Sequence, residues 1–179
     1  MLRREGTALV LVDVQGRLAD AMCDRPALMA GLEKWLRGFA ALRLPVIWCE
    51  QVPEKLGPTV PELAALLPGQ QPIAKNAFSC AGELKFLAAL AATGRRQVIL
   101  CGIETHVCVY QTAMDLLAAG YEVSVATDAV SSRTRENRNL GLEAMRTAGI
   151  GWTGAEMALF ELLRVAEGDD FRAVSRLVR

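Results

Sequence analysis

The stretch QVILCGIETHVCVYQTAMDLLAAG, residues 97–120, contains the pattern that decides the fold. Its first six residues form an apolar β-type run, and a helical pattern begins near Thr105 and ends before Gly120. A buried strand that leads through a short turn into a helix is the repeating unit of α/β proteins. The same stretch holds two of the five cysteines and the single histidine of the chain.

The alternation of strand and helix continues in both directions from this stretch. Strands are predicted at 7–14, 46–50, 72–75, 97–102, 121–130 and 150–152, and helices at 26–42, 61–67, 82–94, 105–120, 134–149 and 154–168. Short strands rich in Val, Ile and Leu that alternate with helices predict a parallel sheet covered on both faces. Right-handed crossovers then give one α/β domain, residues 1–179. We expect a three-layer doubly wound sandwich around a mostly parallel six-stranded sheet, of the Rossmann-like type.

The composition excludes several classes of partner and location. Twenty basic residues balance twenty acidic ones, so the charge gives no reason to expect nucleic acid or an anionic membrane surface as partner. No run of about 18 uncharged apolar residues predicts a membrane-spanning helix. The five cysteines are odd in number and irregular in spacing, which is not a secreted disulfide framework. With no export signal recognised, we expect a reduced, cytoplasmic protein.

Charged side chains follow several of the predicted strands. Asp13, Glu50, Lys75 and Asp128 each come at the end of an apolar strand. In a doubly wound sheet the carboxyl ends of the strands form one edge, and ligands bind there. A charged residue that closes a strand is more often merely solvated, so a functional interpretation requires that these side chains converge.

Cys108 differs in its setting from the other four cysteines. With Thr105 as the N-cap it would lie in the first helical turn, where free backbone N–H groups favour an anion and lower a thiol pKa. His106 and Cys108 lie about 200° apart around such a helix, so they do not share a metal ion. We therefore expect no metal and no cofactor, and His106 lines the mouth of the site or packs against a neighbour.

A coherent chemistry follows if Asp13 and Lys75 lie beside Cys108. An ammonium ~4 Å from a thiolate supplies roughly 4 kcal/mol, which lowers the thiol pKa before opposing effects are counted. Asp13 opposes that effect while it is ionised. Its useful role is to accept the thiol proton and later to pass it to a leaving group.

Ordered motifs in the chain resemble those of the isochorismatase-like cysteine hydrolase superfamily. They are DVQ (13–15), AKNAFS (74–79), GIETHVCV (102–109) and ATDAVSSRT (126–134), and EQVPEKLGPTVPEL (50–63) is similar to the small isochorismatase-domain-containing branch. The resemblance implies a catalytic triad of Asp13, Lys75 and Cys108. It also implies a cis peptide between Ile103 and Glu104, an oxyanion hole made by the N–H groups of Glu104 and Cys108, and a substrate contact at Phe78.

The resemblance predicts a hydrolase of a small-molecule amide that works through a thioester on Cys108. Nicotinamidases of this superfamily carry an Asp and two His residues for a metal, and the corresponding segment here, WCEQVPEK, has no His. Two alternatives stay open. One is hydrolysis of an enol ether with Asp13 as the acid, and the other is a non-catalytic interaction protein whose thiol senses oxidants.

We expect the protein to assemble as a homo-oligomer. The family commonly forms homo-oligomers, and residues 156–178 carry an apolar stripe beyond what a closed sheet needs. The alternative is that this tail packs on its own sheet.

Overall fold

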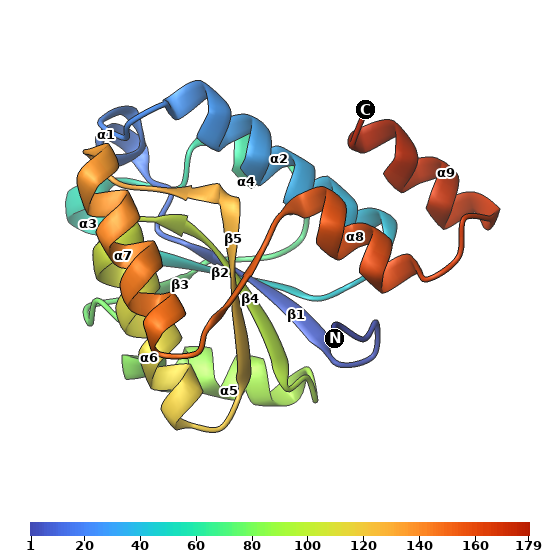
Figure 1. The fold of residues 1–179 in the computed structure, drawn as a ribbon. Coiled ribbons are helices and arrows are strands. Elements are labelled where there is room, and N and C mark those ends of the chain that lie inside the picture. The colour runs from blue at the N-terminus through green and yellow to red at the C-terminus, as the bar shows by residue number, and fades with distance from the viewer.

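A single six-stranded sheet forms the centre of the protein (Figure 1). The computed structural model describes residues 1–179. The strand order is β3-β2-β1-β4-β5-β6, and every neighbouring pair is parallel. The strands are β1 (Thr7–Val12), β2 (Val46–Gln51), β3 (Ile73–Lys75), β4 (Gln97–Ile103), β5 (Glu122–Ser131) and β6 (Gly151–Thr153). The predicted doubly wound α/β fold is confirmed, and the sheet is wholly rather than mostly parallel.

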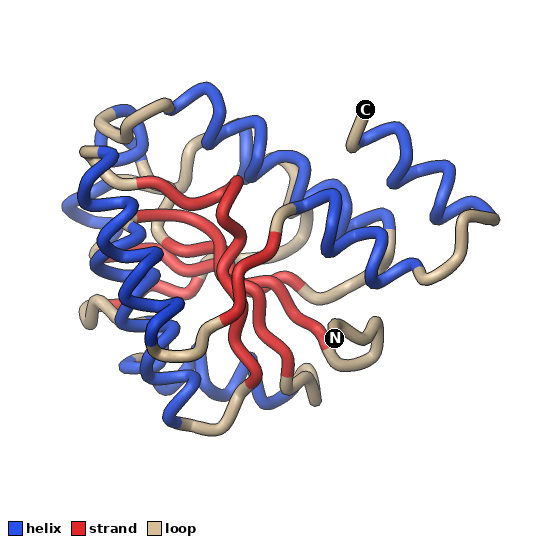
Figure 2. The backbone as a smooth tube through the Cα atoms, viewed as in Figure 1, coloured by secondary structure: helices blue, strands red, loops and turns tan.

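Helices cover both faces of the sheet, as Figures 1 and 2 show. One face is covered by α2 (Arg25–Ala41) and α8 (Ala155–Leu163), with α9 (Gly168–Leu177) packed on these two helices, and the other by α5 (Leu84–Ala92), α6 (Tyr110–Ala118) and α7 (Arg135–Thr147). Each face has its own apolar core, because the side chains of each strand alternate between the two. The short segments are α1 (Gly16–Asp20), α3 (Pro53–Leu56), α4 (Pro61–Ala64), and η1 (Cys80–Gly82), a 3₁₀ turn.

The helix that was predicted to start with Thr105 as its N-cap begins differently. Residues Thr105–Val109 form a π-helical turn, η2, before α6, and Glu104 precedes it without a side-chain cap. The Thr105 hydroxyl donates instead to the carbonyl of Ser131, 2.9 Å away. The capping prediction is therefore wrong, because a hydrogen bond to β5 competes for the hydroxyl.

The direction of strand addition changes between β1 and β4. From β1 the chain builds outward to β3 and then returns to β4 on the other side of β1. Gly102, at φ 114°, lies so close to β1 that a Cβ there would be 2.1 Å from the carbonyl oxygen of Val12. No other residue permits this approach without moving a strand. The crevice outside the carboxyl ends of β1 and β4 is the expected ligand position for this topology.

The C-terminal tail packs on its own domain. Leu159 and Leu162 of α8 and Val174 of α9 are buried in the same core as α2. Asp170 of α9 is also bound by Arg4 at 2.6 Å and by Arg43 at 2.9 Å. The apolar stripe of residues 156–178 is thus largely buried against the chain's own helices, although Met157 and Val165 stay exposed. No helix has both the length and the apolar character needed to cross a membrane.

Candidate active site

Asp13 follows β1 directly and is fully buried. Its backbone is in the left-handed region, at φ 53°, and its N–H donates to the carbonyl of Cys49. Aspartate tolerates this conformation better than most residues. Oδ2 of the carboxylate accepts a 2.7 Å hydrogen bond from Nζ of Lys75, whereas Oδ1 is buried and has no hydrogen-bond partner. A buried carboxylate oxygen without a partner is costly and is available for a proton.

Lys75 is the last residue of β3, and its side chain is inaccessible to solvent. Its Nζ lies 2.7 Å from Oδ2 of Asp13, 2.6 Å from Oε1 of Gln51, 2.8 Å from the carbonyl oxygen of Phe78 and 3.2 Å from that of Ala77. An ammonium has three N–H donors, so four acceptors use all of them. Lys75 therefore acts at this position through its charge.

Burial and charge oppose each other in the Asp13–Lys75 pair. Burial raises the pKa of Asp13 above its usual value, although the charge and hydrogen bond of Lys75 draw it back. Burial alone would lower the pKa of Lys75, but the negative charge of Asp13 leads the effects that raise it above its usual value. The ammonium is thus charged at neutral pH, and Asp13 is a stronger base than an exposed aspartate.

Cys108 is the fourth residue of η2 and is 7% exposed, within the apolar core under α5 and α6. Burial, and then the charge of Asp13, raise the pKa of its thiol, and Lys75 opposes them only in part. The expectation of a lowered pKa is therefore wrong. Desolvation outweighs the helix start and the ammonium, so the resting sulfur is a neutral thiol beside a buried base.

The other residues implied by the resemblance take different positions. The peptide between Ile103 and Glu104 is cis, as expected. The Ile103 side chain is fully buried in the core beneath α2, so only its backbone is available to a substrate. The Glu104 carboxylate accepts hydrogen bonds from the backbone N and Nε of Arg133, at 2.9 and 3.2 Å. The Phe78 carbonyl accepts a hydrogen bond from Lys75, and the residue is 55% exposed.

The last residue of β5 and the residue after it hold η2, the turn that contains Cys108. Thr105 bonds to Ser131, and Nδ1 of His106 lies 3.0 Å from Oγ of Ser132. His106 therefore packs against a neighbour, one of the two roles predicted for it. No group of three His, Cys, Asp or Glu side chains is arranged to hold a metal ion.

Two other charged residues predicted at strand ends do not join this cluster as side-chain partners, and one of them, Asp128, lies within β5 rather than at its end. The Glu50 carboxylate accepts bonds from the N and Oγ1 of Thr59, at 2.6 and 2.7 Å. Asp128 accepts from Nε1 of Trp35 and from the backbone N of Ala155, both at 2.8 Å. Glu50 thus fixes the loop at Thr59, and Asp128 joins α2 and the start of α8 to β5. Gln51, which the sequence reasoning passed over, binds Lys75 instead.

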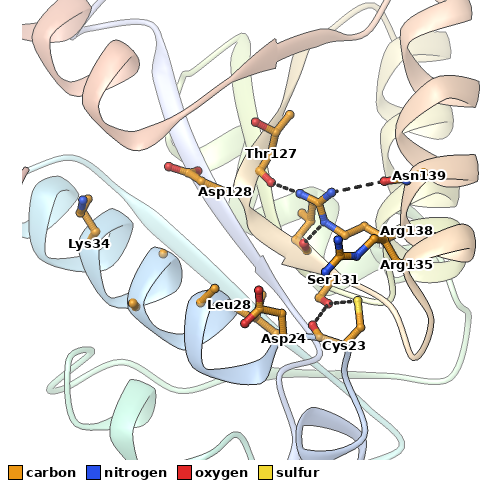
Figure 3. A pocket seen from close by; sticks show the side chains of 14 residues that line it. Cys23, Asp24, Leu28, Lys34, Thr127, Asp128, Ser131, Arg135, Arg138 and Asn139 are labelled. Atoms are coloured by element: carbon orange, nitrogen blue, oxygen red, sulfur yellow. Dashed lines mark hydrogen bonds between the residues drawn. The ribbon is translucent and has the colours of Figure 1, made fainter.

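A cavity of about 720 Å³ lies apart from this cluster, between α2, β5 and the start of α7 (Figure 3). Its polar lining includes Asp24, Lys34, Arg135 and Arg138. Arg138 turns inward, and its Nε donates to the carbonyl of Val130. None of its lining residues is Asp13, Lys75 or Cys108. The buried cluster at the carboxyl ends of β1, β3 and β4 is thus a separate site.

Comparison with known proteins agrees with the fold and with the motifs. The model of the isochorismatase domain matches residues 7–157. The chain belongs to the isochorismatase family. Isochorismatase domain-containing protein 2A of Mus musculus is 35% identical over 178 residues, which cover 98% of this chain and 84% of that protein.

Two solved structures have the same isochorismatase fold along nearly the whole chain. The MAR1 ribonuclease of Caenorhabditis elegans is 33% identical with a TM-score of 0.92, and covers 99% of this chain and 91% of its own. The YcaC gene product of Escherichia coli, described as an octameric hydrolase of unknown specificity, is 27% identical with a TM-score of 0.92, and covers 98% and 88%. As a member of the isochorismatase family, this chain is a hydrolase.

Proposed function

We propose that the protein hydrolyses a C–N bond of a small-molecule amide through a thioester on Cys108. The proposal rests on the different surroundings of the two oxygens of the Asp13 carboxylate. One oxygen is fixed by the Lys75 ammonium, and the other accepts no hydrogen bond from an N–H or O–H group. The Asp13 carboxylate lies close enough to the Cys108 thiol for a hydrogen bond between the two side chains to contribute to the raised pKa of that thiol. A thiol needs a base to become a nucleophile, and Asp13 is a base strengthened by burial.

The reaction proceeds in two halves. The Cys108 sulfur attacks the amide carbonyl while Asp13 takes the thiol proton, and N–H groups at the Ile103–Glu104 turn and at Cys108 stabilise the oxyanion. The C–N bond then breaks, and Asp13 returns the proton to the leaving nitrogen. In the second half Asp13 removes a proton from water, the hydroxide attacks the thioester, and the Cys108 thiol is restored by that proton. The sum is amide plus water to carboxylic acid plus amine.

Lys75 supports both halves by charge alone. Asp13 and Cys108 share one proton during attack, so one unit of negative charge is always present in the buried site. A fixed ammonium compensates this charge in a medium of low dielectric constant, where an unpaired anion would be costly.

A second candidate function is hydrolysis of an enol ether with Asp13 as the proton donor. The raised pKa of Asp13 favours this candidate, since a buried carboxylic acid keeps its proton to a higher pH than an exposed one. In that reaction Cys108 is a bystander. The two candidates therefore differ in their dependence on Cys108.

The test is a panel of small amides, with ammonia release measured for the wild type, Cys108→Ala and the control Cys23→Ala. Cys23 is the half-buried thiol beside the separate cavity. We expect Cys108→Ala to lose at least about a thousandfold in kcat and Cys23→Ala to keep its activity. A Cys108→Ala protein that retains more than about a tenth of the wild-type rate would exclude covalent catalysis.

The same panel includes RNA, because the C. elegans neighbour is described as a ribonuclease. Equal numbers of acidic and basic residues give this chain no overall attraction to a phosphate backbone. We propose that it does not bind nucleic acid. Cleavage of RNA by the wild type but not by Cys108→Ala would change the assigned substrate class.

We also propose a cytoplasmic homo-oligomer. All five cysteines are free thiols, in agreement with a reducing compartment. The octameric E. coli neighbour supports assembly.

A further inference from the structure

The Gln51 side chain is engaged at both ends of its amide. Gln51 is the last residue of β2 and is 7% exposed. Its Oε1 accepts a 2.6 Å hydrogen bond from Nζ of Lys75, and its Nε2 donates to the carbonyl of Asn76 at 2.8 Å. The orientation of the amide is fixed by its partners, because an ammonium can only donate and a carbonyl can only accept.

Gln15 holds the backbone of Gln51 in turn. The Gln15 side chain is buried, and its Oε1 accepts from the N–H of Gln51 at 2.7 Å. Its Nε2 donates to the carbonyls of Gln51, at 3.1 Å, and of Gly57, at 2.6 Å. Register pairing between β1 and β2 ends at Val12 and Cys49, so the Gln15 side chain replaces the strand partner that β2 loses where β1 turns away. Gln51 is therefore fixed by both its backbone and its side chain.

The neutrality of Gln51 is as important as its position. Lys75 has one charged partner, Asp13, and its remaining acceptors are a neutral amide and backbone carbonyls. A neutral acceptor solvates the ammonium without compensating its charge. A carboxylate at position 51 would compete with Asp13 for the same cation and would add a second negative charge beside the thiol.

We propose that Gln51 is a positioning residue of the hydrolase, which holds the Lys75 ammonium on Oδ2 of Asp13 and leaves Oδ1 free for the thiol proton. Gln15 acts through Gln51 by fixing its backbone. This inference rests on the proposed function, because it assigns Asp13 and Cys108 the roles described above.

The test compares Gln51→Met, which has similar length and no hydrogen bonds, with Gln51→Glu, which keeps the acceptor and adds a charge. Gln97→Met is the matched control. Gln97 is also a buried glutamine that makes hydrogen bonds to the backbone of Met1 and Arg3, but it lies at the opposite end of β4. The measurements are kcat, KM, the melting temperature and the rate of Cys108 alkylation by iodoacetamide at fixed pH.

We expect Gln51→Met to lower kcat about 10- to 100-fold with KM within about threefold, because the ammonium is misplaced while substrate contacts remain. We expect Gln51→Glu to slow alkylation about tenfold at pH 8, since the added carboxylate disfavours the thiolate. The pKa of the Cys108 thiol is shifted by three titratable groups, which are the same in all variants: Asp13, Lys75 and Cys80. Gln97→Met should have a lower melting temperature, with kcat, KM and the alkylation rate unchanged.

A Gln51→Glu protein that alkylates at the wild-type rate and turns over normally would overturn the proposal, and this variant decides the question if Gln51→Met does not fold. Equal losses of kcat in Gln51→Met and Gln97→Met would overturn it as well, by showing a loss of stability alone. Failure of the proposed function is separate, because it would appear as turnover by Cys108→Ala.

Discussion

Removal of the Lys75 charge should destabilise the protein, and the size of the effect follows from the structure. In Lys75→Met the side chain keeps its length, but the Asp13 carboxylate becomes a buried anion without a cation. The side chains of Lys75 and Asp13 are both inaccessible to solvent, with 2.7 Å between Nζ and Oδ2. Breaking a buried pair by removing one partner costs about 3–5 kcal/mol. At about 2–4 °C per kcal/mol for a domain of this size, the melting temperature should fall by about 6–20 °C at pH 7.

The loss should depend on pH with a defined sign. Burial already raises the pKa of Asp13, and Lys75 is the main influence that lowers it, so its removal raises the pKa further. A carboxyl group whose folded-state pKa is raised contributes most stability below its unfolded pKa of about 4 and loses that contribution as pH rises through the folded value. The stability deficit of Lys75→Met should therefore shrink as the pH falls from 8 to 5.

The assay is thermal unfolding followed by circular dichroism across this pH range, with the double variant Asp13→Asn/Lys75→Met as the control. The double variant removes both charges of the buried pair, so neither is left without its partner, and it should be more stable than Lys75→Met at pH 7. A deficit below about 1 kcal/mol, the range of exposed ion pairs, with no pH dependence would refute the reasoning. A double variant no more stable than Lys75→Met would refute it equally.

Two further predictions concern the thiol and the assembly. Because the pKa of Cys108 is raised, its alkylation by iodoacetamide should be slow at pH 7 and should accelerate about tenfold per pH unit above it; a fast, pH-independent reaction at neutral pH would show a thiolate instead. Sedimentation at micromolar concentration should give a mass above that of the 19.4 kDa chain, and a monomer would contradict the proposed homo-oligomer.

Most of the sheet could be predicted because its strands are short apolar runs separated by helical periodicity. Topology placed Asp13 and Lys75 at the same end of the sheet, since the carboxyl ends of parallel strands lie together, but their pairing was expected only from the family resemblance. The short helices α1 and α3 were missed, because four or five residues are too few to show a helical period. The π-helical form of η2 has no marker in the sequence.

The electrostatics of the site and the proposed role of Gln51 could not be predicted from the sequence, for physical reasons. The pKa of Cys108 depends on desolvation, and the depth of burial of a first-turn residue is set by packing from α5 and α6. Glu50 and Gln51 are adjacent polar residues at the same strand end. Successive side chains of a strand point to opposite faces, so a shift of one residue in register exchanges their roles. Only the structure shows that Gln51, and not Glu50, accepts the hydrogen bond from Lys75.

The saturated ammonium of Lys75 has a consequence for inhibitor chemistry. A carboxylate or sulfonate designed to form an ion pair with this lysine finds no free N–H, because Asp13, Gln51 and Phe78 already occupy the donors. Such a group must displace one of these partners and leave it buried and unpaired, which offsets the attraction gained. Under the proposed mechanism, affinity is better sought from a neutral carbonyl electrophile that would react with the Cys108 sulfur and place its oxygen at the Ile103–Glu104 turn. Inhibitors with an anionic group should therefore bind this protein more weakly than neutral electrophiles.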